Sequence, residues 1–348
     1  MAISVYYHYQ YLQKNLLSAS FSDLMDCFCL TMAHIKVITK CIVFWFNQRK
    51  FVQLLRMMTE DWNDCANSDI GTQKTTEKAN VADRITNMII LLHTLTIFAY
   101  CLGVVLADVD ITDQTTDLPF FTKFESPFPI TTQLTYRLVL LVEFVHLLIC
   151  AWTAGITNVL LLVLILHVGG QIDILHYWLM QLAPHENNSG RESTVVDASK
   201  IIQKHQKIID FSNHVESLYT YIALMQFVSN TLMICSLGFL IISAIGTPNV
   251  VEEVLRSLFF YTITNLEAFL FCYAGEYLNN KSKEVGVAVY NCAWYNLKSK
   301  DIRVLLFIMK RSQKQLTLTV GKMTNLSLET FTSIMNASGS YLSVLLAI

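Results

Sequence analysis

Residues 134–166 read LTYRLVLLVEFVHLLICAWTAGITNVLLLVLIL, and their only Asp, Glu, Lys, Arg or His side chains are Arg137, Glu143 and His146. A helix needs roughly 20 mainly apolar residues to cross about 30 Å of hydrocarbon. This stretch therefore predicts a membrane-spanning helix and sets the class of the whole chain.

Five further stretches have the same character, so the sequence predicts an all-α multi-pass membrane protein. The five prolines all fall between these stretches, as expected for a residue that disrupts helix interiors. The first and last of the six predicted spans are the least apolar. The spans are residues 22–46, 85–107, 134–166, 219–245, 254–278 and 326–348.

The composition excludes several other classes. Hydrophobic residues make up 53% of the chain, charged residues 15%, and the net charge is −2, which argues against nucleic-acid binders and disordered tails. The nine cysteines form no CxxC pair, and we interpret them as reduced packing thiols without a disulfide framework or zinc site. No Walker loop, GxGxxG, HExxH or GxSxG motif occurs, so we expect no enzyme activity and no cofactor.

Basic residues orient the chain. The segments 47–84, 167–217 and 279–325 together hold 19 of the 25 Lys and Arg residues, whereas 108–133 and 246–253 hold only Lys123. The positive-inside rule then places the three basic segments in the cytoplasm and the C-terminus outside. A G-protein-coupled receptor, whose C-terminus is cytoplasmic, has the opposite sidedness.

Apolar residues at helical spacing also occur within the basic segments. Residues 50–62, 195–219 and 301–309 predict helices that form a packed layer beneath the membrane. Such a layer is typical of subunit assembly, with helix capping of a monomer as the alternative.

The C-terminal third resembles the insect odorant receptors. The similar residues are Phe271-Cys272-Tyr273 with Gly275, Cys292-Ala293-Trp294-Tyr295, Gly321-Lys322-Met323, Leu326-Ser327-Leu328 with Phe331, and Ser340-Tyr341-Leu342-Ser343-Val344-Leu345-Leu346. Earlier pieces are also similar: Phe51-Val52-Gln53-Leu54-Leu55 with Asp61-Trp62, and Leu166-His167 with Gln171-Ile172-Asp173-Ile174-Leu175. The ending with Leu346-Ala347 favours this family over the related gustatory receptors.

The resemblance implies an odorant-gated, non-selective cation channel subunit. It also implies seven spans, an extracellular C-terminus, and a hetero-oligomer, as a tetramer, with a shared co-receptor in the plasma membrane of olfactory neuron dendrites. The alternative is a G-protein-coupled or gustatory-type receptor. Since only six spans are visible, we expect the first to be missing and residues 1–21 to be its remnant. Residues 22–278 then form the ligand-binding bundle, 279–325 an assembly region and 326–348 the pore-lining span.

Ionisable residues within spans are costly and point to function or to buried pairs. Glu143 and His146 are spaced to face each other, and Glu267 and His93 lie mid-span. They either hold helices together or anchor an odorant hydroxyl or carbonyl. Lys36 and Lys40 are expected to extend toward the lipid headgroups.

An odorant pocket should be apolar and aromatic with one or two polar groups. The outer halves of the spans that correspond to the family's pocket offer a candidate set, although each member alone is more typical of helix packing than of ligand contact. The candidates are Phe28, Thr31, Thr96, Tyr100, Ile149, Trp152, Thr153, Tyr261 and Asn265.

The last span carries a stripe of small side chains at steps of four and three: Ser333, Ala337, Ser340, Val344 and Ala347. Such a stripe marks either close helix packing or a pore lining. In the family a valine after the tyrosine that Tyr341 matches forms the constriction. We also expect the acidic segment 108–133 to concentrate cations outside, and none of the sequons at Asn187, Asn325 and Asn336 to be glycosylated.

Overall fold

The computed structural model describes residues 1–66, 68–106, 119–123, 132–182, 198–246 and 250–347. Within these ranges the chain consists of helices, one short hairpin and short connecting segments. The elements are α1 (Ala2–Asn15), α2 (Phe21–Phe46), α3 (Gln48–Ala66), α4 (Asp69–Leu106), α5 (Gln133–Gln181), α6 (Ala198–Ser243), α7 (Val250–Asn291), η1 (Trp294–Asn296), α8 (Ser299–Ser312), β1 (Thr319–Val320), β2 (Thr324–Asn325) and α9 (Leu328–Leu345).

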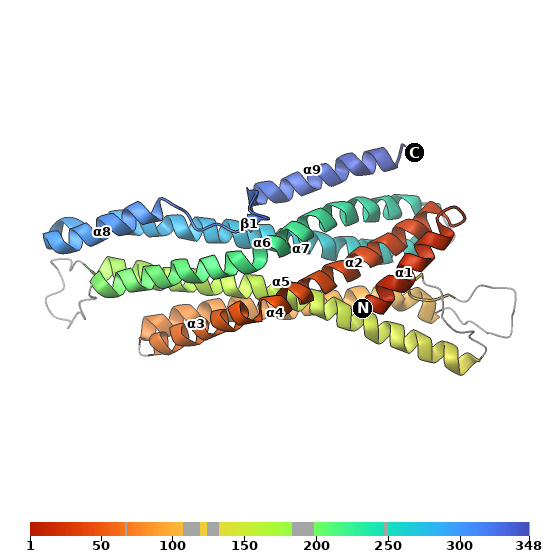
Figure 1. Cartoon of the computed structure of the whole chain (residues 1–348), viewed down its shortest axis with the longest axis horizontal. Helices are drawn as coiled ribbons and strands as arrows, with labels where there is room; N and C mark the ends of the chain where they lie inside the picture. The colour runs from red at the N-terminus through yellow and green to blue at the C-terminus, as the bar shows by residue number, and fades with distance from the viewer. Residues whose placement is uncertain (67, 107–118, 124–131, 183–197, 247–249, 348) are drawn as a thin grey trace.

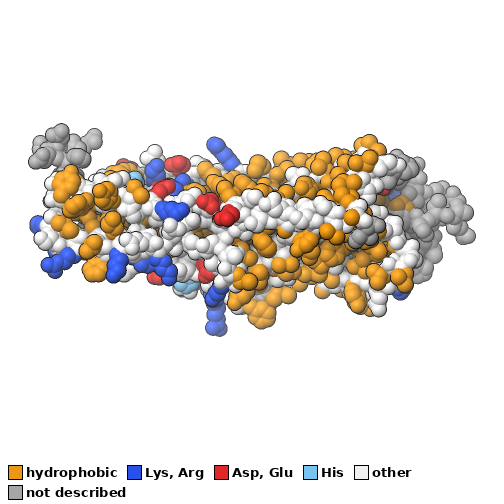
Figure 2. Space-filling model, turned by 90° about the horizontal axis from the view of Figure 1, so that it is seen from above, with side chains coloured by type: hydrophobic (Ala, Val, Ile, Leu, Met, Phe, Trp, Pro, Cys, Tyr) orange, Lys and Arg blue, Asp and Glu red, His pale blue; other side chains and the backbone are white. Residues whose placement is uncertain are grey.

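The long helices run side by side and give an elongated bundle (Figure 1). Its two halves differ in chemistry. Figure 2 shows hydrophobic side chains over one half and most of the visible Lys, Arg, Asp and Glu over the other. We name the charged half, with α3 and α8, the basic end. It corresponds to the predicted cytoplasmic layer.

Five described helices are long and apolar enough to cross a membrane: α2, α4, α5, α6 and α7. The sixth predicted span, α9, is not among them, because Ser, Thr and Asn side chains interrupt its apolar residues. This composition is unusual for a lipid-facing helix, and α9 lies at the edge of the bundle (Figure 1).

The helices extend well beyond the predicted spans. α4 begins at Asp69 rather than at 85, and α5 continues past 166 to Gln181. At the basic end these extensions pack together: Lys78 of α4 and Lys281 of α7 both pair with Asp173 of α5, at 3.4 and 2.8 Å. Ion pairs between neighbouring helices therefore stabilise the polar extensions of these helices outside the apolar region.

The two short helices predicted at 50–62 and 301–309 are confirmed as α3 and α8. Leu54 of α3 and Leu305 and Ile308 of α8 are buried in the large hydrophobic core. The third predicted helix is the start of α6, where Ile201, Ile208 and Val215 are buried. The core of the basic end is thus built from the apolar helix faces that the sequence predicts.

A hairpin of β1 and β2 joins the basic end to α9. Gly321 donates its N–H to the Thr220 carbonyl at 2.9 Å, and both Gly321 and Lys322 adopt positive φ. Gly275 of α7 lies against Leu326, where a Cβ would approach the backbone oxygen to 2.3 Å. Glycine at 275 therefore lets the chain pass close to α7 before α9 begins, where Ser327 caps the helix by accepting from the Thr330 N–H.

Residues 1–21 contain the short helix α1, which packs on α2. Most of the acidic segment 108–133 and the sequon at Asn187 lie outside the described residues. Of the other two sequons, Asn325 is in β2 and Asn336 is on α9.

Candidate ligand-binding site

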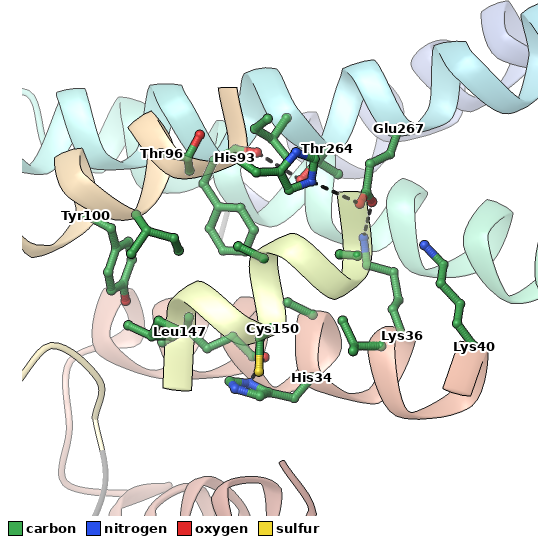
Figure 3. Close-up of a pocket in the computed structure, with 18 residues that line it drawn as sticks. His34, Lys36, Lys40, His93, Thr96, Tyr100, Leu147, Cys150, Thr264 and Glu267 are labelled. Atoms are coloured by element: carbon green, nitrogen blue, oxygen red, sulfur yellow. Dashed lines mark hydrogen bonds and ion pairs between the residues drawn. The ribbon is translucent and has the colours of Figure 1, made fainter. Parts of the chain in front are cut away.

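A cavity of about 90 Å³ lies among α2, α4, α5 and α7 in the middle of the bundle (Figure 3). A single water needs roughly 10–15 Å³ on this scale. The space is therefore large enough for several waters or a small organic molecule. Its walls are mainly apolar, formed by side chains such as Leu30, Val37, Ile97, Leu147 and Phe260.

Two threonines add polarity to these walls. The Thr96 hydroxyl donates to the Leu92 carbonyl at 2.8 Å and the Thr264 hydroxyl to the Phe260 carbonyl at 2.9 Å. Because each O–H is used within its own helix, each oxygen offers the cavity an acceptor lone pair.

One end of the cavity is closed by Tyr100. Its hydroxyl donates to Asp26 at 3.4 Å, and the Arg256 guanidinium lies 4.9 Å from the centre of its ring. Arg256 also pairs with Asp26 at 3.3 Å. This three-residue arrangement fixes the ring through a hydrogen bond and a cation–π contact.

The opposite end carries a buried network centred on Glu267 of α7. Lys36 donates to its carboxylate at 2.8 Å, and Asn158 and Gln226 each donate at 2.7 Å. His93 lies 3.9 Å away, as Figure 3 shows with a dashed line. Five helices, α2, α4, α5, α6 and α7, thus meet at one carboxylate.

The prediction that Lys36 and Lys40 extend toward the headgroups is wrong. Lys36 is 6% exposed and Lys40 3%, and Lys40 donates to the Asn158 side chain. Their buried partners come from helices far along the chain, so nothing near them in the sequence reveals the pairing. The buried lysines are tolerated because Glu267 and the side-chain amides of Asn158 and Asn230 compensate for their lost hydration.

Two of the nine predicted ligand-binding residues, Thr96 and Tyr100, line the cavity. The structure does not bring the other seven there. On α5, Ile149 and Trp152 point outward, 51% and 42% exposed, and the Trp152 indole N–H donates to Thr94. Cys150, Ala151 and Ala154 line the cavity instead of Ile149, Trp152 and Thr153.

The other predicted residues lie beside the cavity on its helices. Thr31 lies between the lining residues Leu30 and Ala33 of α2, but it is buried and its hydroxyl donates to the Cys27 carbonyl, while Phe28 is half-buried. Tyr261 packs toward α6 and α9, and Asn265 donates to the Tyr261 carbonyl. Phe260, Ile263 and Thr264 are the residues of α7 that face the cavity.

Glu143 and His146 both border a second cavity, but each makes its contacts with other residues. Glu143 accepts from the Phe121 N–H at 3.2 Å and the Thr122 hydroxyl at 2.6 Å. His146 instead stacks on His34 of α2, with ring centres 5.2 Å apart. The long segment between α4 and α5 supplies the partner that helical spacing alone could not show.

The small stripe on α9 faces away from the rest of the chain. Ser333, Ser340, Val344 and Ala347 are exposed and Ala337 is half-buried. The opposite face packs on the bundle: Ile334 is buried, and the Ser338 hydroxyl lies 3.2 Å from the Thr231 carbonyl of α6. The described part of the chain therefore leaves most of the stripe uncovered.

The basic end holds a second buried cluster, centred on Asp61 of α3. Its carboxylate pairs with Lys204 at 2.9 Å and with His167 at 3.1 Å. Burial acts to raise the pKa of Asp61, but the hydrogen bonds and charges of His167 and Lys204 outweigh it and hold the pKa below its usual value. The cluster ties α3 to α5 and α6.

A family model described as 7tm odorant receptor matches residues 20–339. Odorant receptor 10 of Aedes albopictus is 33% identical over 169 residues, which are 47% of this chain and 42% of that protein. Odorant receptor 13a of Drosophila melanogaster is 25% identical over 99% of this chain and 84% of its own length. The chain thus aligns with less than half of the first relative and with most of the second.

Among solved structures, the fold is similar to the olfactory receptor OR5 of Machilis hrabei in complex with eugenol. The TM-score is 0.79 at 18% identity, covering 99% of this chain and 88% of that one. A second structure of the same receptor gives a TM-score of 0.74 at 17% identity, with the same coverage of both chains.

Proposed function

Because this chain belongs to the 7tm odorant receptor family, we propose that it is an odorant receptor subunit and that the cavity among α2, α4, α5 and α7 is its odorant site. One observation carries the proposal: a mainly apolar cavity adjoins a buried polar cluster inside the membrane-spanning bundle. This combination suits a small apolar ligand with a single polar group.

The polar features of the cavity suggest the chemistry of that group. Thr96 and Thr264 offer acceptor oxygens, and Lys36 and Lys40 lie at the end near Glu267. A ligand hydroxyl would donate to a threonine, and a carbonyl would accept from a lysine. We therefore favour volatile alcohols, phenols and carbonyl compounds over hydrocarbons.

In this proposal ligand binding opens a non-selective cation channel lined by α9. α9 packs on α6 and α7, and Leu342 lies 3.0 Å from the Cβ position of Gly238 on α6. α7 carries both Glu267 and the Phe260–Thr264 wall of the cavity. A shift of α7 on ligand binding would thus reach α9 directly.

The proposed assembly is a tetramer with the family's shared co-receptor. The basic end carries exposed apolar side chains in the predicted assembly region: Trp294 at 43%, Tyr295 at 67% and Phe307 at 71%. Outside the membrane such residues are costly unless a partner covers them. We propose the plasma membrane of the olfactory neuron dendrite as the site of this assembly.

The test is to record currents from cells that express this chain with the co-receptor while a panel of volatile alcohols, phenols and carbonyl compounds is applied. Odorant-evoked cation current that needs both subunits supports the proposal. A C-terminal epitope tag adds the decisive control against a G-protein-coupled receptor. Labelling of intact cells supports the channel topology, and labelling only after permeabilisation contradicts it.

A further inference from the structure

A cluster of metal-ligating side chains lies beside the cavity. It consists of His34 on α2 with His146 and Cys150 on α5, whose ligating atoms all lie within 4.8 Å of one another. His34 and Cys150 are 2% and 8% exposed, and both line the cavity. Figure 3 shows the Cys150 sulfur directed toward the His34 ring.

We propose that His34, His146 and Cys150 form a binding site for a borderline or soft transition-metal ion, with Zn²⁺ or Cu⁺ as the class of ligand. Two imidazoles and one thiolate are the donors that these ions prefer. His146 and Cys150 are one helical turn apart on α5, and the third donor comes from a different helix.

The distances suit one ion. Zn–N bonds of about 2.0–2.1 Å at the tetrahedral angle put two nitrogens about 3.3 Å apart, and a Zn–S bond of about 2.3 Å puts nitrogen and sulfur about 3.6 Å apart. His34 Nε2 and His146 Nε2 are separated by 3.2 Å, and His146 Nε2 and Cys150 Sγ by 3.7 Å. The His34 and Cys150 atoms also lie within 4.8 Å of each other, so all three donors surround one position.

His34 is oriented for this role. Its Nδ1 lies 2.8 Å from the Leu30 carbonyl, so the proton is on Nδ1 and the Nε2 lone pair points toward His146. A hydrogen bond from the second ring nitrogen to a carbonyl is the arrangement that commonly fixes metal-ligating histidines. The alternative is that His146 simply donates its own Nε2–H to this lone pair.

A third histidine lies next to the cluster. The ring of His8 on α1 is centred 5.4 Å from that of His34, and His8 is 1% exposed. Its Nδ1 bonds to the Lys123 carbonyl at 3.0 Å, while its Nε2 has no partner among the described residues. His8 is thus a candidate for the fourth coordination position.

An entry route exists on the same side. A second cavity of about 510 Å³ between α1 and α5 is lined by His8, Glu143 and His146. An ion arriving there would displace the Cys150 thiol proton as the metal–sulfur bond forms, and that proton would be released. Glu143 supplies a carboxylate on the way.

Cobalt(II) titration of the full chain, purified in detergent, tests the site, because a thiolate bound to tetrahedral Co²⁺ gives a charge-transfer absorption band. We expect one Co²⁺ per chain, with a band that Zn²⁺ abolishes. We expect Cys150→Ser to lose the band and His146→Gln to bind at least about tenfold more weakly. Cys235→Ser, another buried cysteine, and His176→Gln, an exposed histidine on α5, should match the wild type.

The wild-type protein alone keeps the proposal falsifiable should a variant fail to fold. Absence of the thiolate band in the wild type overturns it and leaves the His146–His34 hydrogen bond as the role of these residues. A band that persists in Cys150→Ser, or wild-type affinity in His146→Gln, also overturns it. Zn²⁺ should raise the thermal midpoint of the wild type but not of Cys150→Ser, since a ligand stabilises the state that binds it.

Discussion

Lys36 of α2 and Glu267 of α7 form an ion pair of 2.8 Å within the membrane-spanning bundle, with side chains that are 6% and 5% exposed. Lys40 lies one turn further along α2, so two lysines face one carboxylate. Removing the carboxylate leaves two buried cations without a counter-charge, whereas removing Lys36 leaves one balanced cation and anion.

We therefore expect Glu267→Gln to destabilise the chain by about 3–5 kcal/mol, the usual cost of breaking a buried ion pair. Lys36→Met should cost less, because Lys40 remains to balance Glu267. Thermal unfolding in detergent and surface labelling of cells measure both effects. Equal losses in the two variants, or a greater loss for Lys36→Met, would show that the charge balance is not as described.

The Asp61 cluster predicts a contrast between two aspartates of α3. Asp61→Asn breaks a buried pairing with Lys204 and His167 and should lower stability at pH 7 by about 3–5 kcal/mol. Asp64→Asn removes an ion pair with Lys207 in which the side chains are 62% and 45% exposed, so it should cost no more than about 1 kcal/mol. Thermal midpoints in detergent compare the two, and similar midpoints would argue against a structural role for the cluster.

The same cluster predicts the pH dependence of stability. Because the pKa of Asp61 is lower in the folded chain than its usual value, its contribution is fully present above the ordinary Asp pKa of about 3.9 and is lost as the pH falls through the folded value. Unfolding midpoints measured from pH 7 down to pH 3 should fall less steeply in Asp61→Asn than in the wild type. An identical slope would contradict the lowered pKa.

The exposed stripe of α9 predicts a difference between neighbouring positions. Val344 is 61% exposed and faces away from the chain, while Leu345 is half-buried. With the co-receptor present, Val344→Cys should react with a water-soluble thiol reagent and change the current, and Leu345→Cys should not. Val344→Ala should raise the leak current while odorant rank order stays the same. Equal reactivity of Leu345→Cys and Val344→Cys would contradict the proposal that the stripe lines the pore.

The exposed aromatics of the basic end predict an assembly defect. Trp294→Ala should reduce co-purification with the co-receptor several-fold, because a large apolar side chain is lost from the proposed contact surface. Trp45→Ala is the matched control, since Trp45 is 74% exposed on α2 and lies outside 279–325. Equal effects of the two substitutions would place the contact elsewhere.

Hydropathy located the apolar part of each long helix but not its ends. Asp69–Arg84 was predicted to lie in a loop because it is polar, yet it forms the first turns of α4. Helical backbone there is stabilised by tertiary partners, such as Asp173 for Lys78, that a local window does not contain.

The sequence also could not predict which face of each helix lines the cavity, for a related reason. Ile149 and Ala151 are both apolar, and in a membrane the outward face is as apolar as the inward one, so periodicity does not separate them. Thr96 and Tyr100 were among the candidates because they are polar or aromatic residues in the outer half of a span that corresponds to the family's pocket. The Lys36–Glu267 pair, which joins helices far apart in the chain, required the structure.

The central claim is that the cavity among α2, α4, α5 and α7 binds the odorant that opens the channel. Its most direct test is the odorant-evoked current of Ala154→Leu expressed with the co-receptor, because the larger side chain fills the cavity from α5. We predict at least a tenfold loss of odorant sensitivity with unchanged surface labelling and ligand-independent current, while Ile156→Phe on the exposed face of the same helix responds as the wild type does. A wild-type odorant response in Ala154→Leu would contradict the claim.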